Sequence, residues 1–156
     1  SFSLTTGQAT PTSQCGFKTK SEPLGEFNKP LNPLALAITA GATFVARCNA
    51  RDIDHTQKII EEAINHKGFA FVEIIQDCIV FNIDMNNRDE RMYKLSEKNR
   101  SLKDALDLVY EYDYTSKVGK IPLGIFYRTH RSTLDDEWPP LKMLKEKGVG
   151  WKNFKR

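Results

Sequence analysis

The chain has 156 residues, of which 40% are hydrophobic and 28% are charged, and its formal net charge is +3. This size and composition predict one globular domain or most of one. So small a net charge does not favour nucleic-acid binding, so we expect no nucleic-acid partner. No apolar run approaches the length of about 18 residues that a membrane-spanning helix needs, and no secretory leader is visible, so we expect no membrane association.

Residues 1 to about 31 are rich in Gly, Pro, Ser, Thr and Lys, which predicts a long loop. A structureless segment of this length is unusual in a compact domain unless it binds something or covers a partner. Within it, residues 4–13 gather hydroxyl groups, a carboxamide and a glycine, which can present several donors to an anion such as phosphate. On composition alone, however, such a segment is more often a plain solvated loop.

Asn32 and Pro33 predict the start of a short helix over residues 34–39, because Asn is a favoured N-cap and proline suits the first helical position. Gly41 then ends the helix. Residues 43–47 predict a short strand.

A second helix is expected from about residue 55 to residue 66, with Asp54 as its cap and Gly68 after its end. Residues 69–75 form a nearly continuous apolar run, which is typical of a buried parallel strand. The order helix, strand, helix, strand with short connections predicts an α/β fold with parallel strands and right-handed crossovers.

Beyond residue 82 the sequence changes character, so we divide the chain into a domain over residues 1–82 and a C-terminal extension over residues 83–156. The extension predicts a charged loop with a helical turn at 85–94, and a helix from the cap Ser101 to about residue 110. A third strand follows at 121–127, then a short basic helix after Pro139 and Pro140 within 135–147, and a basic aromatic tail at 151–156.

The order of residues in several segments resembles the beta subunits of 2-oxoacid:ferredoxin oxidoreductases, and most closely the 2-oxoglutarate or broad 2-oxoacid branch. The resemblance runs from about Leu4 to Asn82, with a weaker echo at 121–127. It implies a parallel-sheet thiamine-diphosphate-binding α/β fold, of which this chain would be the C-terminal portion. The segments that carry it are Leu-Thr-Thr-Gly-Gln-x-x-Pro-Thr-Ser at 4–13, Lys-Thr-Lys at 18–20, Asn-Pro-Leu-Ala-Leu-Ala at 32–37, Gly-Ala-Thr-Phe-Val-Ala-Arg at 41–47, His-Lys-Gly-Phe-Ala at 66–70 and Gln-Asp-Cys at 76–78.

The resemblance implies a binding site for thiamine diphosphate and Mg²⁺ at the start of the chain. The backbone carbonyl of Ser1 would ligate Mg²⁺, whereas the side-chain metal ligand and the acidic motif of the family would precede it. No catalytic side chain is assigned, and the isolated piece should bind the cofactor poorly, because one carbonyl cannot complete the coordination of a hard cation. The residues implied to lie against the diphosphate are Leu4, Thr5, Thr6, Gly7 and Gln8.

Cys78 follows the predicted strand 69–75, at the strand end where the sites of α/β folds collect. A single cysteine in such a place is ordinarily a small hydrophobic residue. By resemblance, Cys78 would be the fourth thiolate of a 4Fe–4S cluster, with the other three upstream, and Asp77 replaces the family's proline. Cys15 and Cys48 lack partners at ligand spacing, and three widely spaced cysteines favour a reducing cytoplasm over a disulfide framework.

The implied function is coenzyme A-dependent oxidative decarboxylation of a 2-oxoacid, with an alpha or fused alpha/gamma subunit and ferredoxin as partners. The isolated piece is expected to be inactive. The alternative is a non-catalytic subunit-interaction domain without cofactor. His55, His66 and His130 are expected at the surface or at helix ends, and Lys18 and Lys20 are solvated cations or attract an anionic oxoacid or coenzyme A.

Overall fold

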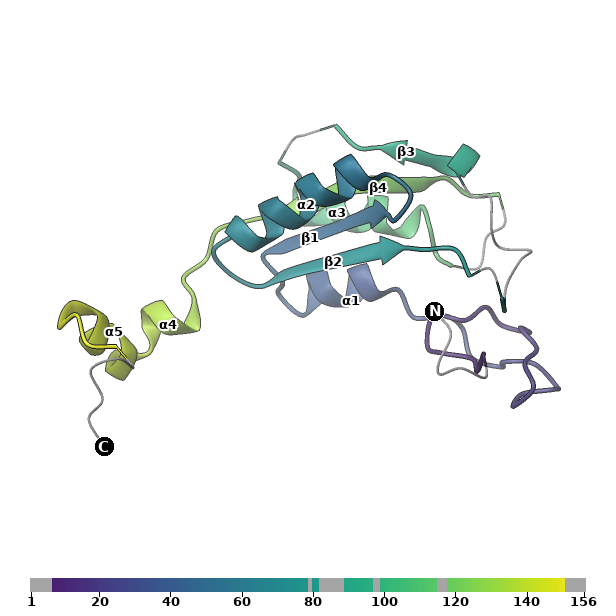
Figure 1. The fold of residues 1–156 in the computed structure, drawn as a ribbon, viewed down its shortest axis with the longest axis horizontal. Coiled ribbons are helices and arrows are strands. Elements are labelled where there is room, and N and C mark those ends of the chain that lie inside the picture. Colours follow the sequence, from purple (N-terminus) through teal and green to yellow (C-terminus); the bar gives the residue numbers. More distant parts are fainter. Residues whose placement is uncertain (1–6, 79, 82–88, 97–98, 115–117, 151–156) are drawn as a thin grey trace.

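The structure, a computed structural model, describes residues 7–78, 80–81, 89–96, 99–114 and 118–150. It contains a four-stranded mixed sheet with helices on both faces (Figure 1). The expected α/β fold is confirmed. Its elements are α1 (Pro33–Thr39), β1 (Phe44–Asn49), α2 (Ile53–Asn65), β2 (Ala70–Ile75), the 3-10 turn η2 (Asp89–Arg91), β3 (Met92–Lys94), α3 (Leu102–Tyr110), β4 (Ile121–Arg128), α4 (Leu134–Glu137) and α5 (Pro139–Glu146).

The helix caps follow the sequence with one exception. The Asn32 side chain accepts a hydrogen bond from the backbone N–H of Ala35, and Ser101 caps α3 in the same way, as predicted. The prediction that Asp54 caps α2 is wrong. Asp52 is the cap, because its side chain accepts from the N–H three residues later, whereas Asp54 lies inside the first helical turn, where its charge suits the helix dipole.

Strands β1 and β2 are parallel, with Phe44 opposite Ala70 and Asn49 opposite Ile75, so both strands end at one edge of the sheet. Helix α2 makes the crossover between them. The sheet order is β2-β1-β4-β3, in which β4 is antiparallel to β1 and β3 is parallel to β4. The extension beyond residue 82 therefore supplies half of the strands of one continuous sheet.

Strand β3 is absent from the expected elements. The stretch 85–94 was predicted to be a loop with a helical turn, and the turn is present as η2. Three residues then pair with β4. Three residues are too few to show the alternation that marks a strand in a sequence, so only the neighbouring β4 defines β3.

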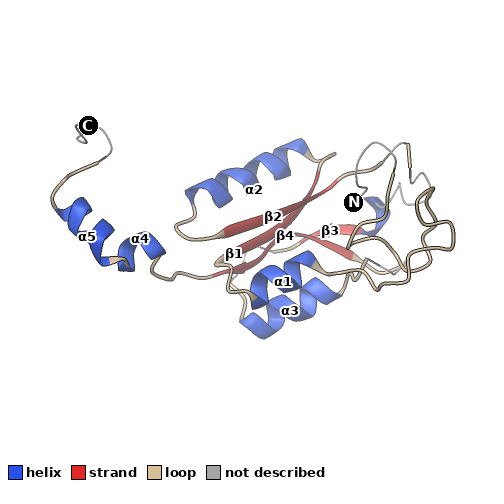
Figure 2. Cartoon of the chain, turned by 90° about the horizontal axis from the view of Figure 1, so that it is seen from below, coloured by secondary structure: helices blue, strands red, loops and turns tan. Residues whose placement is uncertain are grey.

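The core has one layer on each side of the sheet. Figure 2 shows α1 and α3 on one face and α2 on the other. Val45 and Phe126 pack with α1 and α3, whereas Phe44 and Ala46 pack with Ile59 of α2. Because neighbouring residues of a strand point to opposite faces, the apolar run of β1 fills both layers at once.

Helices α4 and α5 stand away from the sheet in both overall views (Figures 1 and 2). The short basic helix expected after Pro139 and Pro140 is present as α5, which begins at Pro139 itself. Helix α4 was not expected, and the extended Trp138 separates it from α5. A 2.7 Å ion pair between Lys67 and Asp136 joins this arm to the body. None of the described helices is both long and apolar enough to cross a membrane.

Candidate functional site

Gly7 is the first described residue of the predicted diphosphate loop; Ser1, Leu4, Thr5 and Thr6 lie outside the described residues. Gly7 is buried and has a φ of +69°, a conformation that favours glycine. A Cβ atom added to it would lie 2.5 Å from the ring of Phe81. The position therefore requires glycine for two independent reasons, backbone conformation and space. Gln8 beside it is partly buried.

The polar groups after Gln8 hold the loop together. The N–H of Thr10 donates to the Ser13 hydroxyl at 2.9 Å, and the N–H of Ser13 donates back to the Thr10 carbonyl at 2.8 Å. The amide of Gln14 donates to the carbonyl of Tyr114 at 3.1 Å, which ties the loop to the body. These contacts form the frame of the loop.

Cys78 lies three residues after β2, at the edge of the sheet where β1 also ends, and it is partly buried. Its sulfur accepts a hydrogen bond of 3.3 Å from the backbone N–H of Phe81. Since the Phe81 ring contacts Gly7, the predicted diphosphate loop and the predicted cluster ligand meet at this one residue.

The other two cysteines have different environments. Cys48 is fully buried in β1, where burial raises the pKa of its thiol, so it is a core residue. Cys15 is exposed, and its thiol lies 3.7 Å from the carbonyl of Phe27. No group of three or more His, Cys, Asp and Glu side chains is arranged for a metal ion within the described ranges. The described part thus offers one sulfur and not a complete cluster or cation site.

Arg51, in the connection between β1 and α2, holds the turn that carries Cys78. Its guanidinium forms an ion pair with Asp77 and another, at 2.6 Å, with Asp89. The negative charge that replaces the family's proline is therefore paired with a cation. A cleft of about 600 Å³ opens beside this pair and is lined by residues that include Asn49 and Lys94.

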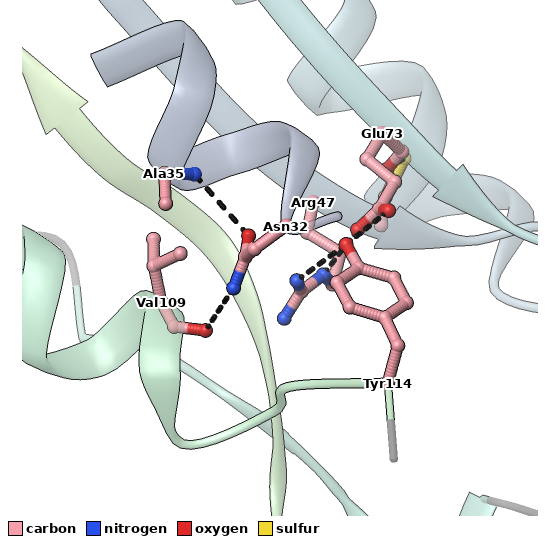
Figure 3. A network of polar contacts seen from close by, with 7 residues as sticks. Asn32, Ala35, Arg47, Glu73, Val109 and Tyr114 are labelled. Atoms are coloured by element: carbon pink, nitrogen blue, oxygen red, sulfur yellow. Dashed lines mark hydrogen bonds and ion pairs between the residues drawn. The ribbon is translucent and has the colours of Figure 1, made fainter. Parts of the chain in front are cut away.

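A buried ionic network joins Arg47 of β1, Glu73 of β2 and Tyr114 (Figure 3). Arg47 and Glu73 lie opposite each other, two residues before the ends of their strands. The Nε of Arg47 donates to Glu73 at 2.5 Å, and its Nη2 donates to the Tyr114 hydroxyl at 3.1 Å. Tyr114 in turn donates to Glu73. The rings of Tyr112 and Phe126 lie within 5.3 Å of the guanidinium carbon, so the buried Nη1, which has no hydrogen-bond partner, lies among aromatic faces.

Charge and burial shift the ionisation of this network. Burial acts to lower the pKa of Arg47, but Glu73 and Tyr114 outweigh it, so the guanidinium stays charged with a raised pKa. Burial and the Glu73 carboxylate raise the pKa of Tyr114 far above its ordinary value. Tyr114 has a φ of +65°, and its carbonyl is the one that accepts from Gln14. The network therefore fixes the residue to which the polar loop is attached.

The three histidines occupy other places. His66 ends α2, and its Nε2 lies 2.9 Å from the Thr43 hydroxyl, at the edge of the sheet opposite Cys78. Burial, Arg128 and His130 lower the pKa of His66. His55 lies in the first turn of α2. The expected helix-end role is confirmed for His66. Lys18 and Lys20 are exposed.

Comparisons with known proteins identify the family of the chain. A family model described as "Thiamine pyrophosphate enzyme, C-terminal TPP binding domain" matches residues 1–74. A 2-oxoacid:ferredoxin oxidoreductase subunit beta from Sulfolobus sp is 40% identical over 143 residues, which cover 81% of this chain and 45% of the relative. This chain is a homologue of part of the beta subunits of 2-oxoacid:ferredoxin oxidoreductases.

Other relatives point the same way. The 2-oxoglutarate oxidoreductase subunit KorB of Mycobacterium tuberculosis is 46% identical over 81 residues, which cover 52% of this chain and 22% of that protein. A solved structure of 2-oxoglutarate:ferredoxin oxidoreductase from Magnetococcus marinus, with 2-oxoglutarate, coenzyme A and succinyl-CoA bound, superposes with a TM-score of 0.78 at 31% identity. That superposition covers 94% of this chain and 50% of the other. This beta-subunit homologue spans about half the length of the proteins that it matches over most of its own length.

The sequence of this beta-subunit homologue indicated Gly7, Gln8 and Cys78 but not the residues that hold them. Phe81 and Arg51 belong to none of the segments that carry the resemblance; Arg47 ends one of them, but that segment does not show its pairing with Glu73 and Tyr114. One signal was available for Arg47, since an arginine inside a strand of otherwise apolar residues must be paired when it is buried. For Phe81 and Arg51 the sequence carries no such signal, because Gly7, which the Phe81 ring contacts, and the acidic partners of Arg51 are distant along the chain.

Proposed function

We propose that this beta-subunit homologue is part of a 2-oxoacid:ferredoxin oxidoreductase of the 2-oxoglutarate branch, which carries out coenzyme A-dependent oxidative decarboxylation. One observation carries the proposal, namely the packing of Gly7 against Phe81, whose N–H donates to Cys78. It joins the segment expected to bind a diphosphate to the cysteine expected to bind a cluster. The relatives named for 2-oxoglutarate support the substrate class.

The described residues fit the implied cofactors only as contributors. Gly7 lets the backbone turn where a side chain would block it. Residues 4–8 are proposed to lie against the diphosphate, and the carbonyl of Ser1 is proposed to ligate Mg²⁺. Thiamine diphosphate, when bound, supplies the carbanion-stabilising chemistry of decarboxylation. Cys78 supplies one soft thiolate, which suits an iron–sulfur cluster; the remaining ligands must come from elsewhere in the enzyme.

We propose that the residues of this chain bind, orient and hold. The loop frame from Thr10 to Gln14 fixes the diphosphate segment, and the ion pair of Arg51 with Asp77 holds the turn that carries Cys78. No catalytic side chain of this chain is assigned. An alpha or fused alpha/gamma subunit would complete the site, with ferredoxin as electron acceptor in the cytoplasm.

The experiment is to express the chain together with its upstream coding region under anaerobic conditions and to record the visible absorption of the iron–sulfur band. We expect a brown protein whose colour is lost in Cys78→Ser. Cys15→Ser is the matched control, because Cys15 is exposed and lies in another segment; it should keep the colour. A folded protein whose colour is indifferent to Cys78→Ser would contradict the ligand role.

The second candidate is a non-catalytic subunit-interaction domain. The arm of α4 and α5 favours it, because this arm exposes Leu134, Trp138 and Met143, which suit contact with another protein. A colourless, folded chain with its upstream region present, which binds an alpha subunit but neither cofactor, would support this candidate over the enzyme.

A further inference from the structure

Phe81 contacts both halves of the proposed site through two different parts of the residue. Its ring lies over Gly7, where an added Cβ would meet the ring carbons Cδ1, Cγ and Cε1 at 2.5, 2.8 and 2.9 Å. Its backbone N–H donates to the sulfur of Cys78 at 3.3 Å. A single residue thus joins two segments that lie far apart in the sequence.

The two contacts are mechanically linked. Gly7 is buried in a left-handed conformation, so the loop cannot shift toward the ring without a clash. The ring and the N–H belong to one residue, so a displacement of the ring that rotation about χ1 and χ2 cannot absorb also shifts the donor relative to the sulfur. An N–H donor stabilises negative charge on a ligand sulfur, and such hydrogen bonds are among the groups that set cluster potentials.

We propose that Phe81 is a positioning residue that couples the polar loop at Gly7 to the sulfur of Cys78. This inference rests on the proposed function, because the two ends of the coupling are its diphosphate segment and its cluster ligand. A change in the conformation of the loop then alters the hydrogen bond to the sulfur. The ring holds the loop, and the amide orients and polarises the thiolate.

The first test measures the link without any cofactor, by amide hydrogen exchange on the 156-residue chain. Gly7→Ala should raise the exchange rate of the Phe81 amide at least about tenfold, because the new methyl group displaces the ring and weakens the bond to the sulfur. The amides of β1 and β2 should keep their rates, which separates this effect from general unfolding.

Gly16→Ala is the matched control. Gly16 also has a positive φ, +81°, but nothing lies within 4 Å of the position of its added Cβ. This variant therefore introduces the same backbone strain without the contact, and it should leave the Phe81 amide unchanged. Equal exchange of the Phe81 amide in Gly7→Ala, Gly16→Ala and the unmodified chain would overturn the coupling.

The second test uses the chain with its upstream region, in which the cluster midpoint potential is measured. Gly7→Ala and Phe81→Leu should both lower the potential, and Phe27→Leu, a change at an 84% exposed phenylalanine, should not. If the cluster is present and its potential does not move, the inference fails. If no cluster forms at all, the proposed function fails, while the exchange result still decides whether Phe81 links the two segments.

Discussion

At the scale of single residues, Arg47 is the largest fully buried side chain of the described residues. It is fully buried, paired with Glu73 and surrounded by aromatic rings. A buried ion pair stabilises little relative to apolar side chains, but removing one partner leaves a desolvated charge. Replacing Glu73 should therefore reveal the free-energy cost of leaving the buried Arg47 charge without its partner.

Glu73→Gln should lower the free energy of unfolding by about 3 kcal/mol, because the isosteric amide leaves the Arg47 charge uncompensated in the core. Urea denaturation monitored by circular dichroism measures the change. Glu61→Gln is the control, because Glu61 is exposed on α2 and accepts a hydrogen bond from the Gln57 side chain on the same helix. This substitution should change the free energy of unfolding by less than about 0.5 kcal/mol. Equal effects of the two substitutions would show that the buried network is not stabilising.

At the scale of elements, the connection from β1 into α2 carries both a cap and an ion pair. Asp52 caps α2 and also forms a 2.7 Å ion pair with Lys94 of β3. The contact with Lys94 and the N–H of His55 lower the pKa of Asp52 from its ordinary value of 3.8. The Asp52 carboxylate thus connects α2 with β3, the strand at the edge of the sheet.

Asp52→Ala should cost about 1 kcal/mol of stability at pH 7, as the loss of an N-cap does. Because the folded pKa is lowered, this stability is present above pH 3.8 and is lost as the pH falls through the folded value. The difference between Asp52→Ala and the unmodified chain should therefore shrink between pH 7 and pH 2.5 in urea titrations. Asp52→Asn, which keeps a capping oxygen without charge, serves as the control and should show a smaller loss at pH 7. A gap that is constant with pH would contradict the role of the charge.

The elements also show which parts of the fold follow from local sequence. Asn32 with Pro33 and Ser101 were recognised as helix starts because a cap depends only on residues three positions apart. For α2 the prediction named Asp54, whereas Asp52 is the cap and Asp54 lies in the first turn, because the start of this helix falls two residues earlier than expected. Strand β3 was missed because its definition depends on pairing with β4.

At the scale of the whole molecule, the sheet and the arm are separate in their packing. The residues beyond 82 provide β4, which lies between β1 and β3 in the sheet, and α3, which packs with α1. The arm of α4 and α5, by contrast, stands away from the sheet, and an exposed ion pair joins it to the body.

A variant that ends at Ser132 should unfold with a free energy within about 1 kcal/mol of that of the full chain, because an exposed ion pair such as Lys67 with Asp136 contributes little. Chemical denaturation of both chains measures this. Lys67→Ala in the full chain isolates the ion pair and should also change little. A loss of several kcal/mol on truncation would show that the arm belongs to the core.

The sequence by itself determined the α/β class, the parallel pair of β1 and β2, the helix starts at Asn32 and Ser101, and the segments that match the family. These depend on periodicity, capping and residue order over short distances. Only the tertiary structure decided the antiparallel place of β4, the pairing of Arg47 with Glu73 and Tyr114, and the meeting of Gly7 and Cys78 at Phe81. These contacts bring together residues from different elements. Their geometry depends on how the strands pair and how the helices pack on the two faces of the sheet, so no local sequence pattern shows them.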